Sequence, residues 1–271
     1  MNIFSNNGPE MIRNEILKNT RDCLITDNRP VGVYISGGID STIVMSHVAD
    51  LGKIYGIKVI AYTADFGLKD NECELQHDIA ENYGVDFVIV KTDGMYKRLN
   101  EIEAIFNKPR FNIWPYFMAE AAKMDGCSKV FLGEGADEVF GGYDKKSYLE
   151  AWADSIIYIQ STYKITHDHF GIDICAPFLM LDWQQYLPLH KNPQKRALRV
   201  AYKDHFPEFI NKRVKSEPPV YANYMLLWEK EFKNNVDIKQ QPKTDIEARD
   251  LIHLEVTRIW VEERTRRLVE A

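Results

Sequence analysis

The sequence predicts an α/β fold with a parallel sheet, because short apolar runs alternate with helical stretches of ten or more residues. Two of the apolar runs, residues 31–35 and 128–132, are each followed at once by a glycine-rich loop. Loops that follow the carboxyl ends of parallel strands are where such folds bind phosphate groups. We therefore expect a doubly wound sheet, covered by helices on both faces, with its binding site at these two loops.

The first half of the chain repeats a strand–helix unit. A helix is expected over residues 9–20, with Pro9 near its start. The nearly continuous apolar run 31–35 is typical of a strand buried on both faces. The next helix, 40–51, has apolar residues at helical spacing, and Gly52 is expected to end it. The remaining elements are strands at 57–63, 86–90 and 128–132 and helices near 70–83, 94–106 and 115–125.

The second half of the chain is predicted to be mostly helical, with stretches near 144–164 and 193–204. Thr244 and Glu247 have the spacing of a capping box, which predicts one amphipathic helix from Thr244 onward. Such a helix would pack on the body of the protein or on another subunit, so a homo-oligomer is one expectation. The chain is accordingly divided into a main domain, residues 1–222, and a helical C-terminal extension, residues 223–271.

Composition favours small-molecule chemistry. The 271 residues are 45% apolar and 27% charged, which allows a sizeable core. The net charge of −6 argues against a nucleic-acid surface, since binding a phosphate backbone needs an excess of lysine and arginine. No apolar run approaches the roughly 20 residues of a membrane span, and the N-terminus lacks the regions of a signal peptide. We expect a cytoplasmic protein without a membrane partner.

The cysteines and histidines show no metal signature. Cys23, Cys73, Cys127 and Cys175 are widely scattered without a C-x-x-C pair, so we expect four thiols rather than a redox or metal site. Residues 167–169, His-Asp-His, are expected to be solvated in a loop, because two imidazoles without a third nearby ligand seldom bind a metal.

The first glycine loop, residues 36–41, has the composition of a phosphate site. It stands where a helix begins, so unpaired backbone N–H groups and the helix dipole favour an anion. Gly37 and Gly38 let the backbone approach that anion, and Ser36 and Ser41 supply hydroxyl donors. Asp40 is an acceptor, which fits beside phosphates only if a cation bridges them, so it implies Mg²⁺.

This loop lacks the Gly-Lys-Ser/Thr ending of kinases and GTPases. It resembles the pyrophosphate loop of the N-type ATP pyrophosphatases, the PP-loop superfamily. The resemblance implies cleavage of ATP between the α and β phosphates, with AMP passed to an acceptor oxygen. Asparagine, GMP, NAD and argininosuccinate synthetases and several tRNA-modifying enzymes share this loop, so it does not choose among them.

The second glycine loop narrows the resemblance. Residues 132–143, Leu-Gly-Glu-Gly-Ala-Asp-Glu-Val-Phe-Gly-Gly-Tyr, are similar to a Gly-Glu-Gly-x-Asp-Glu-x-Phe-Gly-Gly-Tyr stretch of the asparagine synthetase family. That resemblance implies a five-stranded sheet of order 3-2-1-4-5. Strands 1 and 4 are then neighbours, and the two loops face each other across a crevice.

The facing loops supply carboxylates with distinct expected roles. Asp40 and Asp137 are expected to share a Mg²⁺ ion that neutralises charge on the breaking phosphate bond. Glu134 is expected to take the proton of the attacking amine or to hold its ammonium form, a role that the resemblance also implies. Glu138 is expected to support the loop. The positions where the family contacts adenosine, mostly through backbone, are Tyr34, Ala64 and Gly133.

A third segment, residues 195–199, matches the family pattern Lys-x-x-Leu-Arg. The resemblance assigns to Lys195 the family's catalytic lysine, which would stabilise negative charge in adenylation and on pyrophosphate. Arg213 and Lys215 are further phosphate candidates, with surface charge as the alternative.

The amine source departs from the glutamine-using members of the family. Those members begin with a nucleophilic cysteine after removal of Met, whereas position 2 here is Asn and about 30 residues precede the first strand. We therefore expect a synthetase domain without a glutaminase domain. It would use free ammonia, a separate glutaminase subunit or a different amine.

The acyl substrate is a second departure. Residues 171–179 resemble Gly-Val-Glu-x-Arg-x-Pro-Phe-Leu, yet Cys175 stands at the arginine position and Met180 at the aspartate that follows. Leu132 replaces a serine in the same crevice. Loss of a guanidinium removes bidentate recognition of a carboxylate, which argues against aspartate as the substrate.

The leading hypothesis is an AMP-forming ligase that adenylates a carboxylate with ATP and Mg²⁺ and passes the acyl group to ammonia or another amine. Within it, asparagine formation competes with metabolite amidation, β-lactam closure and peptide cyclisation. The alternatives are a pyrophosphatase that modifies tRNA or a nucleobase, and a non-catalytic ATP-binding relative.

Overall fold

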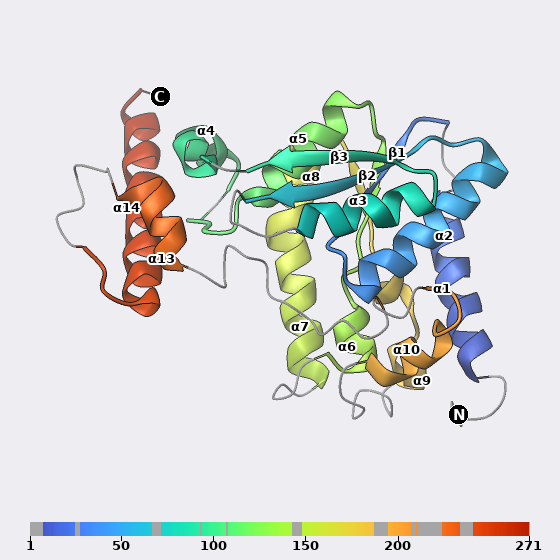
Figure 1. The fold of residues 1–271 in the computed structure, drawn as a ribbon. Helices are drawn as coiled ribbons and strands as arrows, with labels where there is room; N and C mark the ends of the chain where they lie inside the picture. Colours follow the sequence, from blue (N-terminus) through green and yellow to red (C-terminus); the bar gives the residue numbers. More distant parts are fainter. Residues whose placement is uncertain are drawn as a thin grey trace.

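Five parallel strands form one sheet in the order β3-β2-β1-β4-β5. Figure 1 shows β1, β2 and β3 of this sheet. This order confirms the one that the resemblance implied. The strands are β1 Val31–Tyr34, β2 Val59–Asp65, β3 Asp86–Lys91, β4 Lys129–Phe131 and β5 Asp173–Cys175. The computed structural model describes residues 8–24, 28–66, 72–92, 94–106, 108–142, 148–186, 195–206, 210, 224–233 and 241–270.

Side chains of β1 alternate between two hydrophobic cores, one on each face of the sheet. Val31 and Val33 belong to the core formed with α1 Gly8–Leu24 and α2 Ile39–Tyr55. Tyr34 belongs to the opposite core, formed with α5 Trp114–Met124 and α8 Lys164–Phe170. This alternation follows from strand geometry, and it buries β1 on both faces as its apolar sequence predicts.

Helix α2 extends one turn beyond its predicted end. It continues to Tyr55, and Gly56 ends it in the left-handed conformation with φ 68°. The prediction that Gly52 ends the helix was therefore wrong. A Cβ atom at position 52 would lie 2.6 Å from Cγ2 of Val59, so Gly52 instead allows α2 to pack closely against β2.

The other helices cover the sheet or lie beyond it. The predicted helix 94–106 is broken into two 3₁₀ turns and a short α-helix. The helices other than α1 and α2 are α3 Glu72–Asn82, η1 Met95–Arg98, α4 Leu99–Ile102, η2 Glu103–Ile105, α5 Trp114–Met124, α6 Ala136–Phe140, α7 Tyr148–Tyr158, the π-helix η3 Ile159–Tyr163, α8 Lys164–Phe170, η4 Pro177–Met180, α9 Trp183–Tyr186, α10 Arg196–Ala201, α13 Tyr224–Leu227, the π-helix η7 Trp228–Phe232 and α14 Asp245–Glu270.

The His-Asp-His segment lies in helix α8, so its prediction as a loop was wrong. His167 is fully buried, and its Nδ1–H donates to the carbonyl oxygen of Tyr163 at 2.7 Å. Its Nε2 accepts a hydrogen bond from the hydroxyl of Tyr34, also at 2.7 Å. This pairing could not be predicted from local sequence patterns, because the two residues lie 133 positions apart.

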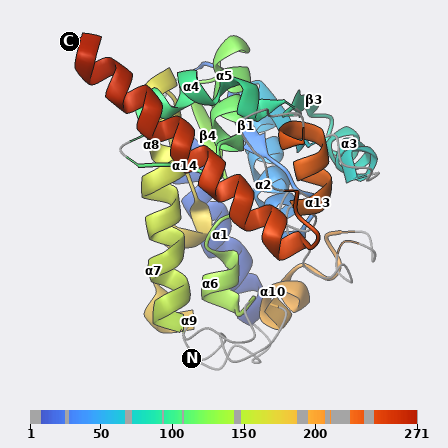
Figure 2. The same ribbon diagram turned by 90° about the vertical axis from the view of Figure 1, so that its left-hand side faces the viewer.

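The C-terminal helix α14 begins at the predicted capping box and packs along α4, η2 and α13 (Figure 2). Oγ1 of Thr244 accepts the N–H of Glu247 at 3.2 Å, and the Glu247 carboxylate accepts the N–H of Lys243 at 2.7 Å. Ala248 and Ile252 join the same core as Tyr34. The division of the chain at residue 222 stays a prediction.

A disulfide joins Cys23, near the end of α1, to Cys175, the last residue of β5. Their Cα atoms are 6.3 Å apart although the residues are separated by 152 positions. The expectation of four thiols was therefore wrong for this pair, because cysteine spacing does not reveal which strands and helices meet. Cys73 and Cys127 are free thiols.

Within the described ranges, none of the helices combines the length and the apolar composition that crossing a bilayer would require.

Candidate active site

The first glycine loop connects β1 to α2 and is closed by its own hydroxyl groups. Gly37 adopts φ 70°, and Gly38 is the N-cap of α2. The Ser41 hydroxyl accepts the N–H of Ser36 at 3.1 Å and donates to the carbonyl oxygen of Gly38 at 3.2 Å. Ser36 itself is exposed. The loop thus holds a fixed shape at the positive end of a helix of 17 residues, where an anion is favoured.

The second glycine loop lies directly against the first. A Cβ atom at Gly133 would lie 2.8 Å from the backbone nitrogen of Ser41 and 3.1 Å from the carbonyl carbon of Asp40. A Cβ atom at Gly142 would overlap the carboxylate of Asp137, 1.5 Å from Oδ1. These contacts explain why glycine stands at both positions, and they place the loops after β1 and β4 side by side.

Lys195 joins the two loops through ion pairs with two partly buried carboxylates. Its ammonium contacts the carboxylate of Asp40 and lies 2.8 Å from Oδ1 of Asp137. The lysine is 5% exposed. Burial alone would lower the pKa of Lys195, but the two carboxylates outweigh burial and raise that pKa above its usual value. The lysine is thus held as a cation at neutral pH.

The backbone at Lys195 is strained. Lys195 has φ 56° and ψ 39°, and among the described residues it is the one non-glycine residue with a positive φ. Its N–H donates to the carbonyl oxygen of Gly141, at the end of the second loop, at 3.1 Å. Non-glycine residues in this conformation cost about 1–2 kcal/mol and concentrate at functional sites. With this backbone conformation, the side chain of Lys195 contacts both loops at the point where α10 begins.

The donor set fits a magnesium ion. Asp40 and Asp137 come from different loops and converge on one cationic group, and carboxylate oxygens are the protein ligands that Mg²⁺ prefers. Among the described residues, a separate cluster of potential ligands, His77, Asp78 and Glu81, lies on the exposed surface of α3. It is remote from this chemistry in the sequence and belongs to no glycine loop.

The remaining acidic residues of the second loop differ in burial. Glu134 is partly exposed, between Gly133 and the N-cap residue of α6. Glu138 is 1% exposed in the body of α6. A carboxylate that meets a substrate needs an exposed face, so the two environments agree with a substrate role for Glu134 and a supporting role for Glu138, which both stay predictions.

The expected adenosine positions lie at the carboxyl ends of neighbouring strands. Tyr34 pairs with Tyr62 across β1 and β2, and Ala64 lies two residues farther along β2. The Tyr34 side chain points into the core toward His167, where burial raises the pKa of the phenol and lowers the pKa of the imidazole to about 4. The backbone of Tyr34 is therefore the part left for a ligand.

Arg199 is the arginine of the Lys-x-x-Leu-Arg pattern at residues 195–199, and no role was predicted for it. Arg199 follows Lys195 by one helical turn in α10, and burial lowers the pKa of its guanidinium, partly offset by the field of Asp40. A second cation near the paired carboxylates could have been suspected from this spacing. The predicted phosphate candidates Arg213 and Lys215 lie outside the described residues.

The three positions that depart from the family pattern lie together at the end of β5. Sγ of Cys23, the disulfide partner of Cys175, is 3.4 Å from Sδ of Met180. The N–H of Leu132 donates to the carbonyl oxygen of Cys175 at 2.8 Å. Sulfur and apolar groups thus fill the place where the family pattern has an arginine and an aspartate.

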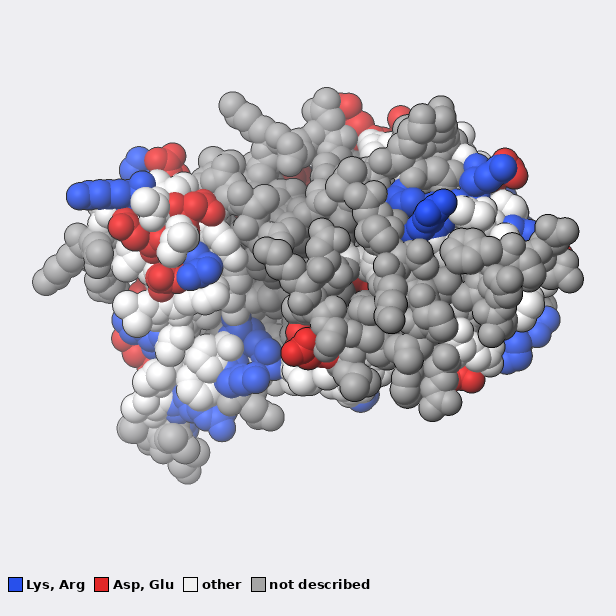
Figure 3. All heavy atoms as spheres, turned by 90° about the horizontal axis from the view of Figure 1, so that it is seen from below, with Lys and Arg blue, Asp and Glu red and all other residues white. Residues whose placement is uncertain are grey.

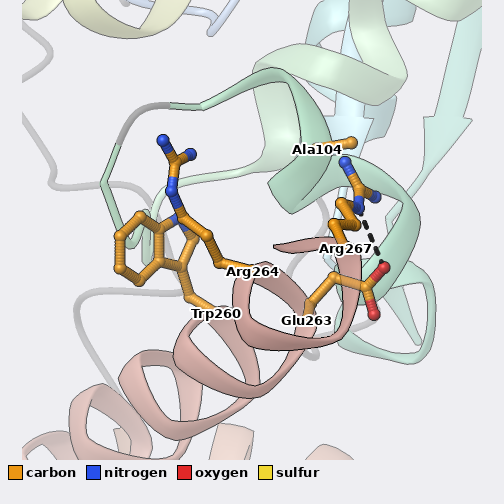
Figure 4. Close-up of a pocket in the computed structure, with 5 residues that line it drawn as sticks. All are labelled: Ala104, Trp260, Glu263, Arg264 and Arg267. Carbon is orange, nitrogen blue, oxygen red and sulfur yellow. Dashed lines mark hydrogen bonds and ion pairs between the residues drawn. The ribbon is translucent and has the colours of Figure 1, made fainter. Parts of the chain in front are cut away.

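A small pocket elsewhere does not compete with this site. It lies between η2 and α14, has a volume of about 30 Å³, and is lined in part by Trp260, Arg264 and Arg267 (Figure 4). The guanidinium of Arg264 lies 5.4 Å from the centre of the Trp260 ring, and Arg267 pairs with Glu263 at 3.1 Å. A space of this size holds about one water molecule, far less than a nucleotide.

The fold and the first loop define an ATP-binding α/β protein of the PP-loop class, with a second loop that completes its site. The chain belongs to the asparagine synthase family, whose sequence model matches residues 11–256. Members of this family use ATP, and membership supports a ligase-type, amide-forming enzyme.

Curated relatives match part of the chain. The amidase chry2 of Gibberella zeae is 33% identical over 50% of this chain and 22% of its own length. The amidase chyE of Penicillium rubens is 32% identical over 42% of this chain and 20% of its own length. A putative glutamine-hydrolysing asparagine synthetase of Methanocaldococcus jannaschii is 26% identical over 62% of this chain and 33% of its own length. The matches thus span a third or less of each relative.

Among solved structures, the U34-tRNA thiolase NcsA from Methanococcus maripaludis is similar, with a TM-score of 0.45 and 16% identity. The similarity covers 96% of this chain and 80% of the thiolase chain.

Proposed function

We propose that the protein activates a carboxylate as an acyl-adenylate, releasing pyrophosphate from ATP, and then joins the acyl group to ammonia or another amine. The observation that carries this proposal is the meeting of Asp40, Asp137 and Lys195 where the loops after β1 and β4 lie side by side. Family membership supports the same class of reaction.

The first step uses the charges of the two loops. Backbone N–H groups and the hydroxyl of Ser36 would bind the departing pyrophosphate at the N-terminus of α2. Asp40 and Asp137 would hold Mg²⁺, which when bound neutralises charge on the phosphates. Lys195 would bind the oxygens on which negative charge grows as the bond between the α and β phosphates breaks.

The second step needs a group that accepts a proton. The amine nitrogen attacks the carbonyl carbon of the acyl-adenylate, and AMP leaves with the electron pair of the broken C–O bond. The nitrogen must lose a proton, and Glu134 is the partly exposed carboxylate of the second loop that could accept it. The products are an amide, AMP and pyrophosphate.

The acyl substrate is proposed to be a carboxylic acid other than aspartate. Cys175 and Met180 contribute no cation at the end of β5, and Cys175 is 3% exposed within a disulfide. A second carboxylate on the substrate would find no arginine there. The names of two relatives as amidases agree with amide chemistry.

ATP–pyrophosphate exchange, measured across a panel of carboxylic acids with aspartate and tRNA included, tests this proposal. We expect exchange that depends on a carboxylic acid and disappears in Asp40→Ala. Exchange stimulated by tRNA alone would overturn the proposal in favour of a nucleic-acid-modifying enzyme, and no exchange with any compound would favour a non-catalytic ATP-binding protein. Asparagine formed from aspartate and ammonia would overturn the substrate proposal alone.

The described part of the face seen from below bears on the tRNA alternative. Lys and Arg side chains there stand beside Asp and Glu side chains (Figure 3). A protein surface that binds tRNA presents a continuous basic field, because it must neutralise many phosphates at once. The mixed charges of this face support a small-molecule substrate.

A further inference from the structure

The Cys23–Cys175 disulfide lies in the wall of a pocket of about 400 Å³. The pocket is bounded by the end of α1, the edge strand β5 and the π-helix η3 with the start of α8. Its volume is within the range that binds small molecules. The polar and sulfur-bearing residues that line it include Cys23, Cys175, Lys129, Gln160, Lys164 and Asp173.

The two sulfur atoms differ in access. Cys175 is buried, with 3% of its surface exposed, whereas Cys23 is partly exposed. An incoming thiolate therefore reaches Sγ of Cys23, and Cys175 is the leaving group. Lys129, which also lines the pocket, donates its ammonium hydrogen bond to the carbonyl oxygen of Cys23.

The disulfide also completes the attachment of α1 to the elements that carry the site. The amide of Asn19 donates to the carbonyl oxygen of Pro177 in η4 at 3.1 Å. Arg13 donates to the carbonyl oxygen of Ala201, the last residue of α10, at 2.6 Å. Helix α10 begins directly after Lys195, so α1 supports the helix that positions the catalytic lysine.

Cys175 is itself close to the second glycine loop. Its carbonyl oxygen accepts the N–H of Leu132, and Leu132 immediately precedes Gly133. A side chain beyond the disulfide, Leu179, also lines the pocket, and a Cβ atom at Gly135 would lie 2.7 Å from it. The wall of the pocket and the back of the loop are therefore formed by the same segment, residues 175–179.

We propose that Cys23 and Cys175 form a thiol–disulfide exchange site for a low-molecular-weight dithiol, and that its reduction loosens α1 and the second glycine loop. One thiolate of the dithiol attacks Sγ of Cys23, the protein S–S bond breaks, and Cys175 leaves as a thiolate that takes up a proton. The second thiol of the reagent, after losing its proton, attacks the mixed disulfide. It forms the reagent's own disulfide and releases Cys23 as a thiolate, which is protonated in turn. Two electrons pass from the dithiol to the protein.

Thiol counting tests the chemistry. Purified protein is unfolded and alkylated before and after treatment with dithiothreitol, and the labels are located by mass spectrometry. We expect two labels before reduction, on Cys73 and Cys127, and four afterwards. Four labels in protein handled without reductant under air would overturn the proposal. So would reduction that proceeds with a large protein dithiol but not with dithiothreitol, because the pocket would then not be the route.

Hydrogen exchange followed by mass spectrometry tests the structural consequence. On reduction we expect faster amide exchange in peptides that cover residues 8–24 and 128–142, with little change in α14. Cys23→Ser should show the exchange rates of the reduced protein and no response to dithiothreitol. Cys73→Ser, which removes a free thiol outside the pocket, should respond like the unmodified protein. Unchanged exchange on reduction, with Cys23→Ser equal to the oxidised protein, would overturn the structural consequence.

The effect on catalysis rests on the proposed function and is measured separately. We expect reduction to lower ATP–pyrophosphate exchange severalfold, and reoxidation to restore it. If the proposed function is wrong, ATP–pyrophosphate exchange is absent in both redox states. The thiol counts and the rates of amide hydrogen exchange still decide the redox proposal. If the enzyme is active, equal rates of ATP–pyrophosphate exchange in the oxidised and reduced proteins would overturn the proposal that reduction affects the second glycine loop.

Discussion

The loops after β1 and β4 and the end of β5 lie at the same edge of one sheet, yet they carry opposite kinds of side chain. Between the two loops, Asp40, Asp137 and Lys195 form a charged group in which the lysine is buried and the carboxylates are partly buried. At the end of β5, Cys175 and Met180 gather with Cys23 around sulfur. The charged group agrees with the family pattern at every position, and the sulfur group departs from it. Under the proposed function, the residues that would split ATP and those that would select the acid therefore lie in separate parts of the site.

The largest effect on activity is expected from a change in the charged group. Asp40→Ala removes one of two carboxylates that face a buried ammonium, and truncating a buried charge pair is strongly destabilising to the arrangement. We expect ATP–pyrophosphate exchange to fall by about a thousandfold or more, as when a preorganised electrostatic group is lost. Asp40→Asn, which keeps the shape, serves as the matched control for packing. Exchange within tenfold of the unmodified protein in both variants would refute the role.

The two chemical steps are separated by a change at Glu134. Glu134→Gln keeps the size of the side chain but removes its basicity, so adenylation should continue while amide formation falls by about a hundredfold. Pyrophosphate exchange and amide product are measured on the same preparations. An equal loss of both would show that Glu134 does not act as the base for the amine.

The contact between the loops is tested at Gly133. A Cβ atom there would lie 2.8 Å from the backbone nitrogen of Ser41, so Gly133→Ala must push the loops apart. Overpacking of this kind costs about 1–3 kcal/mol, and we expect about tenfold weaker ATP binding by calorimetry. Gly56→Ala is the control. It places a side chain at φ 68° with nothing within 4 Å, at the far end of α2, so it should lower thermal stability without changing ATP affinity.

The last prediction concerns stability rather than catalysis and involves two buried histidines. Burial lowers the pKa of His47, which lies 2.7 Å from the hydroxyl of Tyr202, and the pKa of His167 to about 4 each. Above pH 6.5 both imidazoles are neutral in the folded and unfolded chains. As pH falls from 6.5 toward 4, the unfolded chain takes up protons that the folded chain does not.

The free energy of unfolding should therefore decrease by about 1.4 kcal/mol per pH unit for each histidine across that window. Urea unfolding at pH 7.5, 6.5 and 5.5 measures the slope. His47→Gln should remove about half of it, and the same slope in His47→Gln as in the unmodified protein would contradict the assignment.

Most of the fold could be predicted because its strands are local apolar runs bounded by glycine loops. The run at residues 31–35 predicts a doubly buried strand, and β1 is buried along its whole length. The resemblance implied a fifth strand, but local sequence patterns did not locate its residues, Asp173–Cys175. Gly52 was misplaced because a glycine needed for close packing of a helix on a strand cannot be told from a terminating glycine by sequence.

The site was harder to predict wherever it depends on long-range contacts. Carboxylates at Asp40 and Asp137 could be recognised as candidate ligands from the loop sequences. The contact of Lys195 with Asp40, however, joins residues 155 positions apart. The same limit applies to the disulfide and to the bond between Tyr34 and His167. Local patterns thus indicate which residues bear charge, and only the fold shows which charges meet.

The left-handed backbone at Lys195 has a consequence for binding. A lysine on a mobile surface loses several freely rotating bonds when it captures a phosphate, and that loss of conformational entropy weakens the complex. Here the start of α10 and the hydrogen bond to Gly141 fix the Cα atom, and the two carboxylates already restrict the ammonium. The entropy of ordering this side chain is spent during folding, so a polyphosphate that arrives in the crevice meets a cation that is already in position.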